Sequence, residues 1–210
     1  MTASSKRLRR WELALLLGLA LAALLGARLD GAQGALADKV LRLHVLANSD
    51  SQQDQALKLQ VRDAVLEQAE GLLAGAESRV EAEAILAAHL DSLAAAGAEA
   101  VGTAGYSYPV TASLEDSCWF PTRVYEDFAL PAGLYTALRV EIGSGAGQNW
   151  WCVVFPPLCL GSVTETAAET AAQAGLTEQE VALLSGGEGE YEIKFRAVEL
   201  VERLRHWLEG

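Results

Sequence analysis

The chain has 210 residues and a mass of 22.3 kDa, and 51% of its residues are hydrophobic, which is enough to build the core of one ordinary domain. Its formal net charge is -12 and its pI is near 4.7. A protein that binds a phosphate backbone needs a concentrated basic face, so this balance argues against nucleic acid as a partner.

The first part of the chain predicts a targeting segment. Basic residues between Lys6 and Arg10 precede an uncharged apolar run over residues 13–27, as in an export signal. The run is shorter than the roughly 20 residues that span a bilayer comfortably, and Ala35–Ala37 offers an A-x-A cleavage site. We interpret residues 1–37 as a signal peptide or an N-terminal membrane anchor, and residues 38–210 as one exported domain.

Loss of this segment would remove more basic than acidic side chains, so the exported domain is more acidic than the whole chain. A strongly acidic surface favours a basic partner, because opposite charges attract across an interface. Solubility alone is the other explanation of the same charge. The two explanations remain open at the level of sequence.

A strand and a helix are predicted at the start of the exported domain. Residues 40–47 alternate between apolar and polar side chains, with Arg42 and His44 on the polar face of the expected strand. The polar segment 48–51 follows. Its last serine, with Asp54 three residues later, is typical of a helix N-terminus.

The remaining patterns give the order βαα, then a β meander, then ααβα. Helices are predicted from Gln52 to about Gly71 and over 78–96, 164–174, 177–184 and 197–208, and strands over 106–114, 121–128, 133–142, 149–155 and 191–195. The helix at 177–184 opens with Thr177 and Glu180 in capping-box spacing, and the stretch 139–155 is interpreted as a hairpin with a glycine-rich connection. We therefore expect a single α+β domain with a mostly antiparallel sheet, a β meander plus an N-terminal strand, packed with several helices.

Histidines and cysteines show no recognisable metal-binding spacing. The three histidines, His44, His89 and His206, form no H-x-H or H-E-x-x-H pair. Cys152 and Cys159 are separated by six residues, whereas zinc sites of this class use two. The sequence therefore predicts no metal and no cofactor.

The three cysteines allow two hypotheses. A turn at the prolines of "CVVFPPLC" would place Cys152 opposite Cys159, so a disulfide and a pair of buried thiols both remain open. A nucleophilic Cys118 or Cys152 with His44 as base is the sharpest enzymatic hypothesis. No local signature supports it, and the apolar neighbours of Cys152 would make its thiol inert. The G-x-S-x-G and D-[TS]-G motifs of serine and aspartic hydrolases do not occur.

Aromatic side chains gather in the predicted meander. Trp150 and Trp151 are adjacent on one predicted strand, so their side chains point to opposite faces of the sheet. Either one tryptophan is exposed as an anchor for a protein partner, or both faces of the sheet are covered. The sequence leaves both alternatives open.

Two long stretches of the chain resemble a known family. They are "LRLHVLANSDSQQDQALKLQVRDAVL" at 41–66 and "FPTRVYEDFALPAGLYTALRVEIGSGAGQNWWCVVFPPLC" at 120–159. Both are similar to stage II sporulation protein R of endospore-forming bacteria, and so is their order after an export signal. The alanine-rich segment 74–100 departs from the family pattern.

The resemblance implies a signalling protein without catalytic residues. Such a protein is made in the forespore, exported into the space between the two cells, and either secreted or anchored at its N-terminus. There it would activate a membrane-embedded aspartic protease of the mother cell, which processes a sigma-factor precursor, the pro-sigma-E form. Neither nucleic acid nor a small-molecule substrate is expected. The rivals are a cell-envelope hydrolase with a Cys/His or carboxylate site and a passive ligand-binding module.

We predict that two groups of side chains form the partner surface. The first displays polar residues around the strand–helix joint, and the second combines arginine with aromatic residues. The predicted partner-binding residues are His44, Asn48, Asp50, Asp54, Arg62, Arg123, Tyr125, Trp150 and Trp151. The alternative for Asn48 and Asp50 is that they only satisfy the backbone of the turn.

Overall fold

The computed structural model describes residues 12–18, 34–125, 128–158, 170–172, 175–178 and 180–181. The chain divides into two compact units, Met1–Ala35 and Leu36–Gly210. In the first unit a short helix is described over residues 12–18, with exposed leucines. Most of the predicted targeting segment lies outside the described residues, so its cleavage and the predicted boundary at residue 37 stay predictions.

The described residues of the second unit form helices α2, α3 and α4 and two sheets. Its elements are β1 (Leu41–Leu46), α2 (Gln52–Leu73), α3 (Arg79–Ala88), α4 (Leu90–Thr103), β2 (Val110–Phe120), β3 (Arg123–Val124), β4 (Ala129–Leu130), β5 (Gly133–Ile142) and β6 (Asn149–Phe155). The larger sheet has the order β2-β5-β1-β6, and β3 pairs with β4 in a separate ribbon. Strand β1 runs parallel to β5 and antiparallel to β6, and β2 is antiparallel to β5. The predicted α+β class is confirmed.

The predicted hairpin over 139–155 is wrong. Strand β1 lies between β5 and β6, so these two strands do not pair with each other. Their glycine-rich connection crosses the end of β1, where Gly147 N donates to Ala47 O at 2.9 Å. Alternation along a strand shows which side chains share a face, but it does not show which strands are neighbours.

Three further elements differ from their predicted extents. The helix predicted over 78–96 is broken at His89 into α3 and α4, which allows α3 to pack against β1 while α4 packs against α2 and β2. The strand predicted over 121–128 is reduced to short β3, and β4 follows it, because Pro121 and Pro131 flank these segments and cannot donate to a ladder. Strand β2 starts at Val110 and continues to Phe120, beyond the predicted 106–114.

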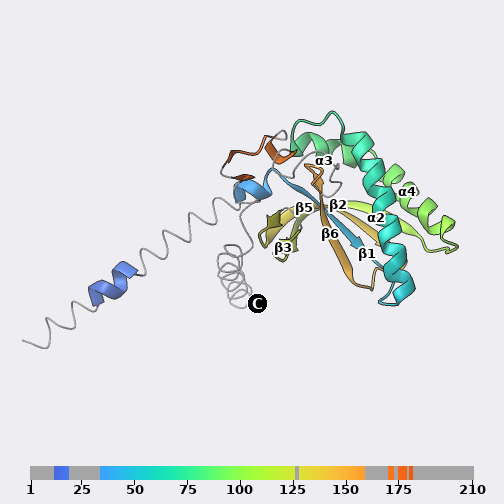
Figure 1. Ribbon diagram of the computed structural model, residues 1–210, viewed down its shortest axis with the longest axis horizontal. Helices are drawn as coiled ribbons and strands as arrows, with labels where there is room; N and C mark the ends of the chain where they lie inside the picture. Colours follow the sequence, from blue (N-terminus) through green and yellow to red (C-terminus); the bar gives the residue numbers. More distant parts are fainter. Residues whose placement is uncertain are drawn as a thin grey trace, which may run out of the picture. The chain divides into compact units, whose positions relative to one another are not determined.

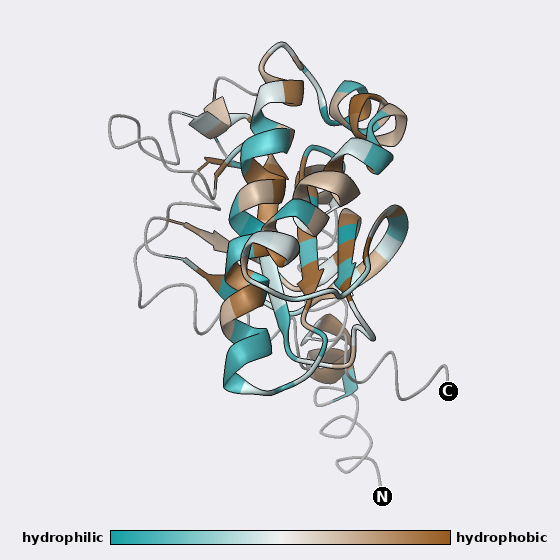
Figure 2. Cartoon of the chain, turned by 90° about the vertical axis from the view of Figure 1, so that its right-hand side faces the viewer, coloured by the Kyte–Doolittle hydropathy of each residue, from teal (hydrophilic) through white to brown (hydrophobic). Residues whose placement is uncertain are grey.

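Helices α2, α3 and α4 lie together on one side of the larger sheet, and the β3–β4 ribbon lies apart from them (Figure 1). The long helix α2 carries hydrophobic and hydrophilic bands along its length (Figure 2), as expected of a helix with one face in a core. Its buried Leu57, Val61 and Val65 join Leu43 and Val45 of β1 in the core between helices and sheet.

The other face of the sheet is also covered at one end. A second cluster there contains Val40, Phe120, Phe128, Leu130 and Tyr135. Burial on both faces explains why β1, which runs through the middle of the sheet, has no fully solvated side.

Among the described residues, no single helix is long and apolar enough to cross a membrane. Only α3 and α4 taken together reach that length and composition, and they are bent by 69°.

The region after β6 is described only in part. Thr177 N donates to Glu180 Oε2 at 2.7 Å, and Glu180 N donates to Thr177 Oγ1 at 3.4 Å, which confirms the predicted capping box. The helix predicted over 164–174 is described only at 170–172. The strand predicted at 191–195 and the helix predicted at 197–208 lie outside the described residues.

Candidate functional site

The joint between β1 and α2 is built around Asp54. This side chain is 5% exposed, and its carboxylate accepts hydrogen bonds from Asn48 Nδ2 at 2.9 Å and from Ser49 Oγ. The hydrogen bond from Ser49 and, to a lesser degree, that from Asn48 hold the pKa of Asp54 below its ordinary value. Ser51 Oγ accepts from Asp54 N at 3.1 Å, so the predicted helix cap is confirmed.

The same joint holds the β5–β6 connection in place. Asn48 Oδ1 accepts from Ser144 N at 3.0 Å, and Asp50 Oδ1 accepts from Gln148 N at 2.7 Å. Asn48 and Asp50 therefore accept from backbone groups of the β5–β6 connection, not of the turn in which they lie, and their predicted role in partner binding stays a prediction. Asp50 remains exposed, whereas Asp54 is enclosed and orders the joint.

One arginine–tryptophan pair lies on the helix side of β6. The guanidinium carbon of Arg62 is 4.5 Å from the centroid of the Trp150 ring, and Arg62 also forms an ion pair with Asp63 at 2.7 Å. Trp150 packs against the core under the helices. The contact is a cation–π pair at the edge of that core.

A second arginine–tryptophan pair lies on the opposite face. The guanidinium carbon of the exposed Arg123 is 4.3 Å from the Trp151 ring centroid. Tyr125 Oη donates to Trp151 O at 3.0 Å and accepts from Arg42 Nη2 at 3.1 Å. The structure thus brings Arg123, Tyr125 and Trp151 together, and the sheet separates them from Trp150.

Both adjacent tryptophans are half-buried, so the sheet is covered on both faces at this strand. The large exposed tryptophan among the described residues is Trp119, which is 49% exposed at the end of β2. No sequence pattern distinguishes Trp119 from the other aromatic residues of the predicted meander, so its exposure could not be predicted.

Arg42 was predicted on the polar face of its strand, and its burial was not foreseen. Its side chain is fully buried, with the guanidinium carbon 4.2 Å from the Phe120 ring centroid and 5.1 Å from that of Tyr135. Its Nε donates to Cys152 O at 3.4 Å, whereas Nη1 has no hydrogen-bond partner in the described part of the chain. Among the described residues no carboxylate pairs with it, and burial lowers its pKa.

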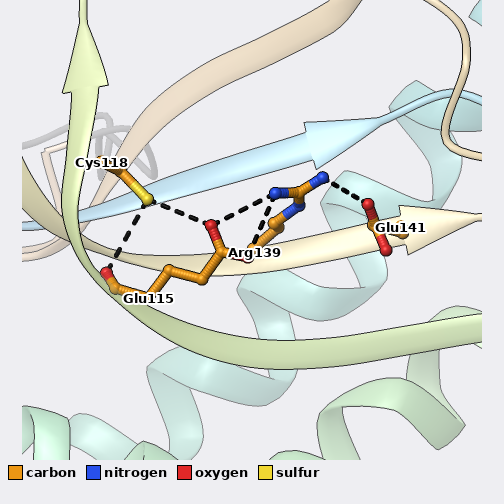
Figure 3. Close-up of polar contacts among 4 residues, drawn as sticks. All are labelled: Glu115, Cys118, Arg139 and Glu141. Carbon is orange, nitrogen blue, oxygen red and sulfur yellow. Dashed lines mark hydrogen bonds and ion pairs between the residues drawn. The ribbon is translucent and has the colours of Figure 1, made fainter.

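A charged cluster lies where β2 and β5 run side by side (Figure 3). His44 is opposite Arg139 in one ladder and opposite Trp151 in the other, so the cluster shares a face of the sheet with Trp151. Arg139 Nη1 donates to Glu115 Oε1 at 3.1 Å and to Oε2 at 3.2 Å, and Arg139 Nη2 pairs with Glu141. The sequence signal for this cluster was present, since Arg139 and Glu141 are alternate residues of one strand and so share a face. That Glu115 is their neighbour depends on the pairing of β2 with β5.

The cysteines are poorly suited to nucleophilic catalysis. Cys118 Sγ donates to Glu115 Oε2 at 3.2 Å. Burial is the main cause and the Glu115 carboxylate the second cause that raise the pKa of this thiol to about 11. The nucleophilic thiolate is therefore scarce at neutral pH. Cys152 is disulfide-bonded, and Cys159, its predicted partner, lies outside the described residues. The described part of the chain contains no group of three or more potential metal ligands.

His44 lies between the charged cluster and the aromatic residues. Its ring centroid is 5.9 Å from that of Phe120 and 6.1 Å from that of Trp151, and its buried Nε2 has no hydrogen-bond partner among the residues described. Burial lowers the pKa of His44, and the nearby polar groups are Asn149 and the three charged side chains of the cluster.

Acidification is expected to destabilise the fold through His44. Because the folded pKa lies below the ordinary 6.5, the unfolded chain takes up a proton first as the pH falls. The stability associated with neutral His44 is therefore complete above about pH 6.5 and is lost as the pH falls towards the folded pKa. Urea unfolding at about pH 7.5 and about pH 5.5 measures this loss. His44→Phe should reduce the pH dependence, and His89→Gln, at an exposed histidine, should preserve it. Equal pH dependence in all three proteins would contradict the assignment.

The comparisons with known proteins decide the family. Residues 37–165, more than half of the chain, match the family model for stage II sporulation protein R. The chain belongs to the stage II sporulation protein R family. It is 39% identical over 122 residues to stage II sporulation protein R of Bacillus subtilis strain 168. The aligned part is 58% of this chain and 54% of that relative, so the match spans about half the length of the curated protein. No solved structure matches the chain.

The part that matches the stage II sporulation protein R family includes every side chain of the candidate site. The joint, both arginine–tryptophan pairs and the charged cluster all fall within residues 37–165. The family is named for sporulation and not for a chemical reaction, so membership supports a role in that process.

Proposed function

We propose that this chain is an exported signalling protein of endospore formation that binds and activates a membrane-embedded aspartic protease, which then processes a sigma-factor precursor. The observation that carries the proposal is the match of residues 37–165 to the stage II sporulation protein R family. The protein acts between the forespore and the mother cell, either secreted or anchored by its N-terminal segment.

Binding explains the geometry of the site better than catalysis does. The Cys118 thiol is protonated at neutral pH and Cys152 is disulfide-bonded, so neither cysteine supports the Cys/His form of the rival hydrolase. Arg123 is instead exposed over the Trp151 ring. Arginine and tryptophan are the residues most often found at the energetic centre of protein interfaces.

Activation by binding requires a difference in affinity. A ligand shifts the protease towards its active state only if it binds that state more tightly than the inactive one. A rigid surface loses little conformational freedom when it binds. The joint around Asp54, which ties β1, α2 and the β5–β6 connection together, provides that rigidity.

Co-expression of the full chain with the protease and the tagged precursor tests the proposal. Precursor processing, followed by immunoblot, should require the chain. Arg123→Glu should lower processing by about tenfold without changing the thermal unfolding midpoint. Glu99→Lys, a charge reversal at an exposed position of α4, is the matched control and should process normally.

Two outcomes would count against the proposal. Processing that proceeds equally well without the chain would remove the activating role. Loss of processing in Cys118→Ser, which keeps a hydroxyl donor for Glu115 and removes the thiol, would favour the rival hydrolase.

A further inference from the structure

Strand β2 offers an open edge to a partner. Within the part of the chain that the structure describes, it is the outermost strand of the larger sheet and pairs only with β5. Its backbone groups on the outer side have no backbone partner among the described residues. Such an edge is a template for another extended chain, because each unpaired N–H and C=O can form a ladder hydrogen bond.

The regular part of this edge is short and accessible. It runs from Val110 to Glu115, before a bulge at which Ser117 has φ of 57°. Thr111 and Ser113 are exposed within it. A bulge interrupts pairing, so the edge can accept a segment of limited length and not an indefinite ladder.

The charge around the edge selects a basic segment. Glu115 and Glu141 both pair with Arg139, and Asp116 accepts from the Thr136 hydroxyl, which in turn accepts from Arg79. Because Arg79 is already paired with Glu83, carboxylates still outnumber guanidinium groups around the edge. Burial alone would raise the pKa of Glu115, but hydrogen bonds from Cys118 and Arg139 lower it overall, so this carboxylate is ionised at neutral pH. The neutral Cys118 thiol adds no charge. A lysine or arginine of the incoming strand would meet a net negative surface.

An apolar contact lies beyond the bulge. Trp119 is directly opposite Leu134 in the ladder between β2 and β5, and the two side chains are 49% and 58% exposed. Residues directly opposite in a ladder lie side by side on one face. An exposed tryptophan of this kind can anchor an apolar side chain of the partner.

We propose that an extended, basic segment of the protease pairs along Val110–Glu115 of β2 as a fifth strand and places an apolar side chain against Trp119. This inference rests on the proposed function, because it takes the partner from it. It identifies the contact as a backbone ladder with charge complementarity, separate from the Arg123–Trp151 pair.

Site-specific photo-crosslinking in cells tests the ladder. The full chain carries a photoreactive phenylalanine analogue at position 113 on the edge or, as a control, at the exposed position 70 of α2, and is co-expressed with the epitope-tagged protease. We expect an adduct with the tagged protease from position 113 and none from position 70. An adduct from position 113 with a second copy of the chain would overturn the inference, and so would active processing without any adduct at 113.

A pair of charge variants tests the selectivity of the same edge. Ser113 lies opposite Arg139 in the ladder between β2 and β5. Ser113→Lys therefore adds a positive charge beside Arg139, which would repel a basic segment, and should lower processing by about tenfold. Ser113→Glu changes the same position with the opposite charge and should keep processing within about twofold of the unmodified chain. Equal processing by the two variants would overturn the charge argument.

The apolar contact has its own test, and the two proposals can fail separately. Trp119→Ala should lower processing by about tenfold, whereas Val80→Ala, at another exposed apolar residue, should not. Normal processing by Trp119→Ala would overturn the anchor. If processing depends on the chain and on Arg123 but not on Ser113 or Trp119, the edge inference fails and the proposed function stands. If processing does not depend on the chain, both fail.

Discussion

Replacing Arg42 by alanine is expected to lower the free energy of unfolding by about 3 to 5 kcal/mol, while replacing it by methionine should change that free energy by less than about 1.5 kcal/mol. Arg42 is fully buried between the rings of Phe120 and Tyr135. Alanine would leave a cavity between these rings and remove the donor to Tyr125 Oη. Methionine fills the space with a flexible apolar chain and removes a buried charge that has no carboxylate partner among the described residues.

Urea unfolding of the unmodified chain, Arg42→Ala and Arg42→Met at one pH measures these differences in the free energy of unfolding. Processing in the co-expression assay should follow stability for both variants, because Arg42 is enclosed and cannot contact a partner directly. If Arg42→Met unfolds as readily as Arg42→Ala, the charge itself contributes to stability, and the account of Arg42 as a packed but electrostatically unfavourable residue is wrong.

Replacing Gly147 by alanine is expected to lower the free energy of unfolding by about 2 kcal/mol. A Cβ atom at this position would lie 2.3 Å from Ser49 O and 3.0 Å from Ala47 Cβ. The first of these atoms belongs to the backbone of the joint, so the β5–β6 connection would have to move away. That movement would stretch the hydrogen bonds from Gly147 N to Ala47 O and from Gln148 N to Asp50.

Gly71→Ala is the matched control for this substitution. Gly71 is exposed near the end of α2, and a Cβ there would meet no atom within 4 Å. Because alanine is the better helix former, the variant should be more stable by about 0.5 kcal/mol. Equal effects of the two alanines on the urea midpoint would show that the close approach at Gly147 does not constrain the fold.

The sequence by itself determined the elements whose signals are local. Strands β5 and β6 were predicted with their observed bounds. Glycines and prolines mark their ends, apolar and charged residues alternate in the second half of β5, and β6 is a short apolar run. The start of α2 followed from Ser51 and Asp54, because a helix cap needs only an acceptor three residues before a free N–H. Family membership was also readable from the chain, since the resemblance lies in two ungapped stretches.

Only the tertiary structure decided how these elements meet. The insertion of β1 between β5 and β6 joins strands that are about 100 residues apart in the chain, and no local pattern encodes that pairing. This placement buries Arg42 in the middle of a two-sided sheet, although alternation alone had assigned it to a polar face. It also brings Glu115 beside Arg139 and leaves β2 at the edge. Side-chain periodicity fixes the faces of a strand, whereas its neighbours depend on the packing of the whole core.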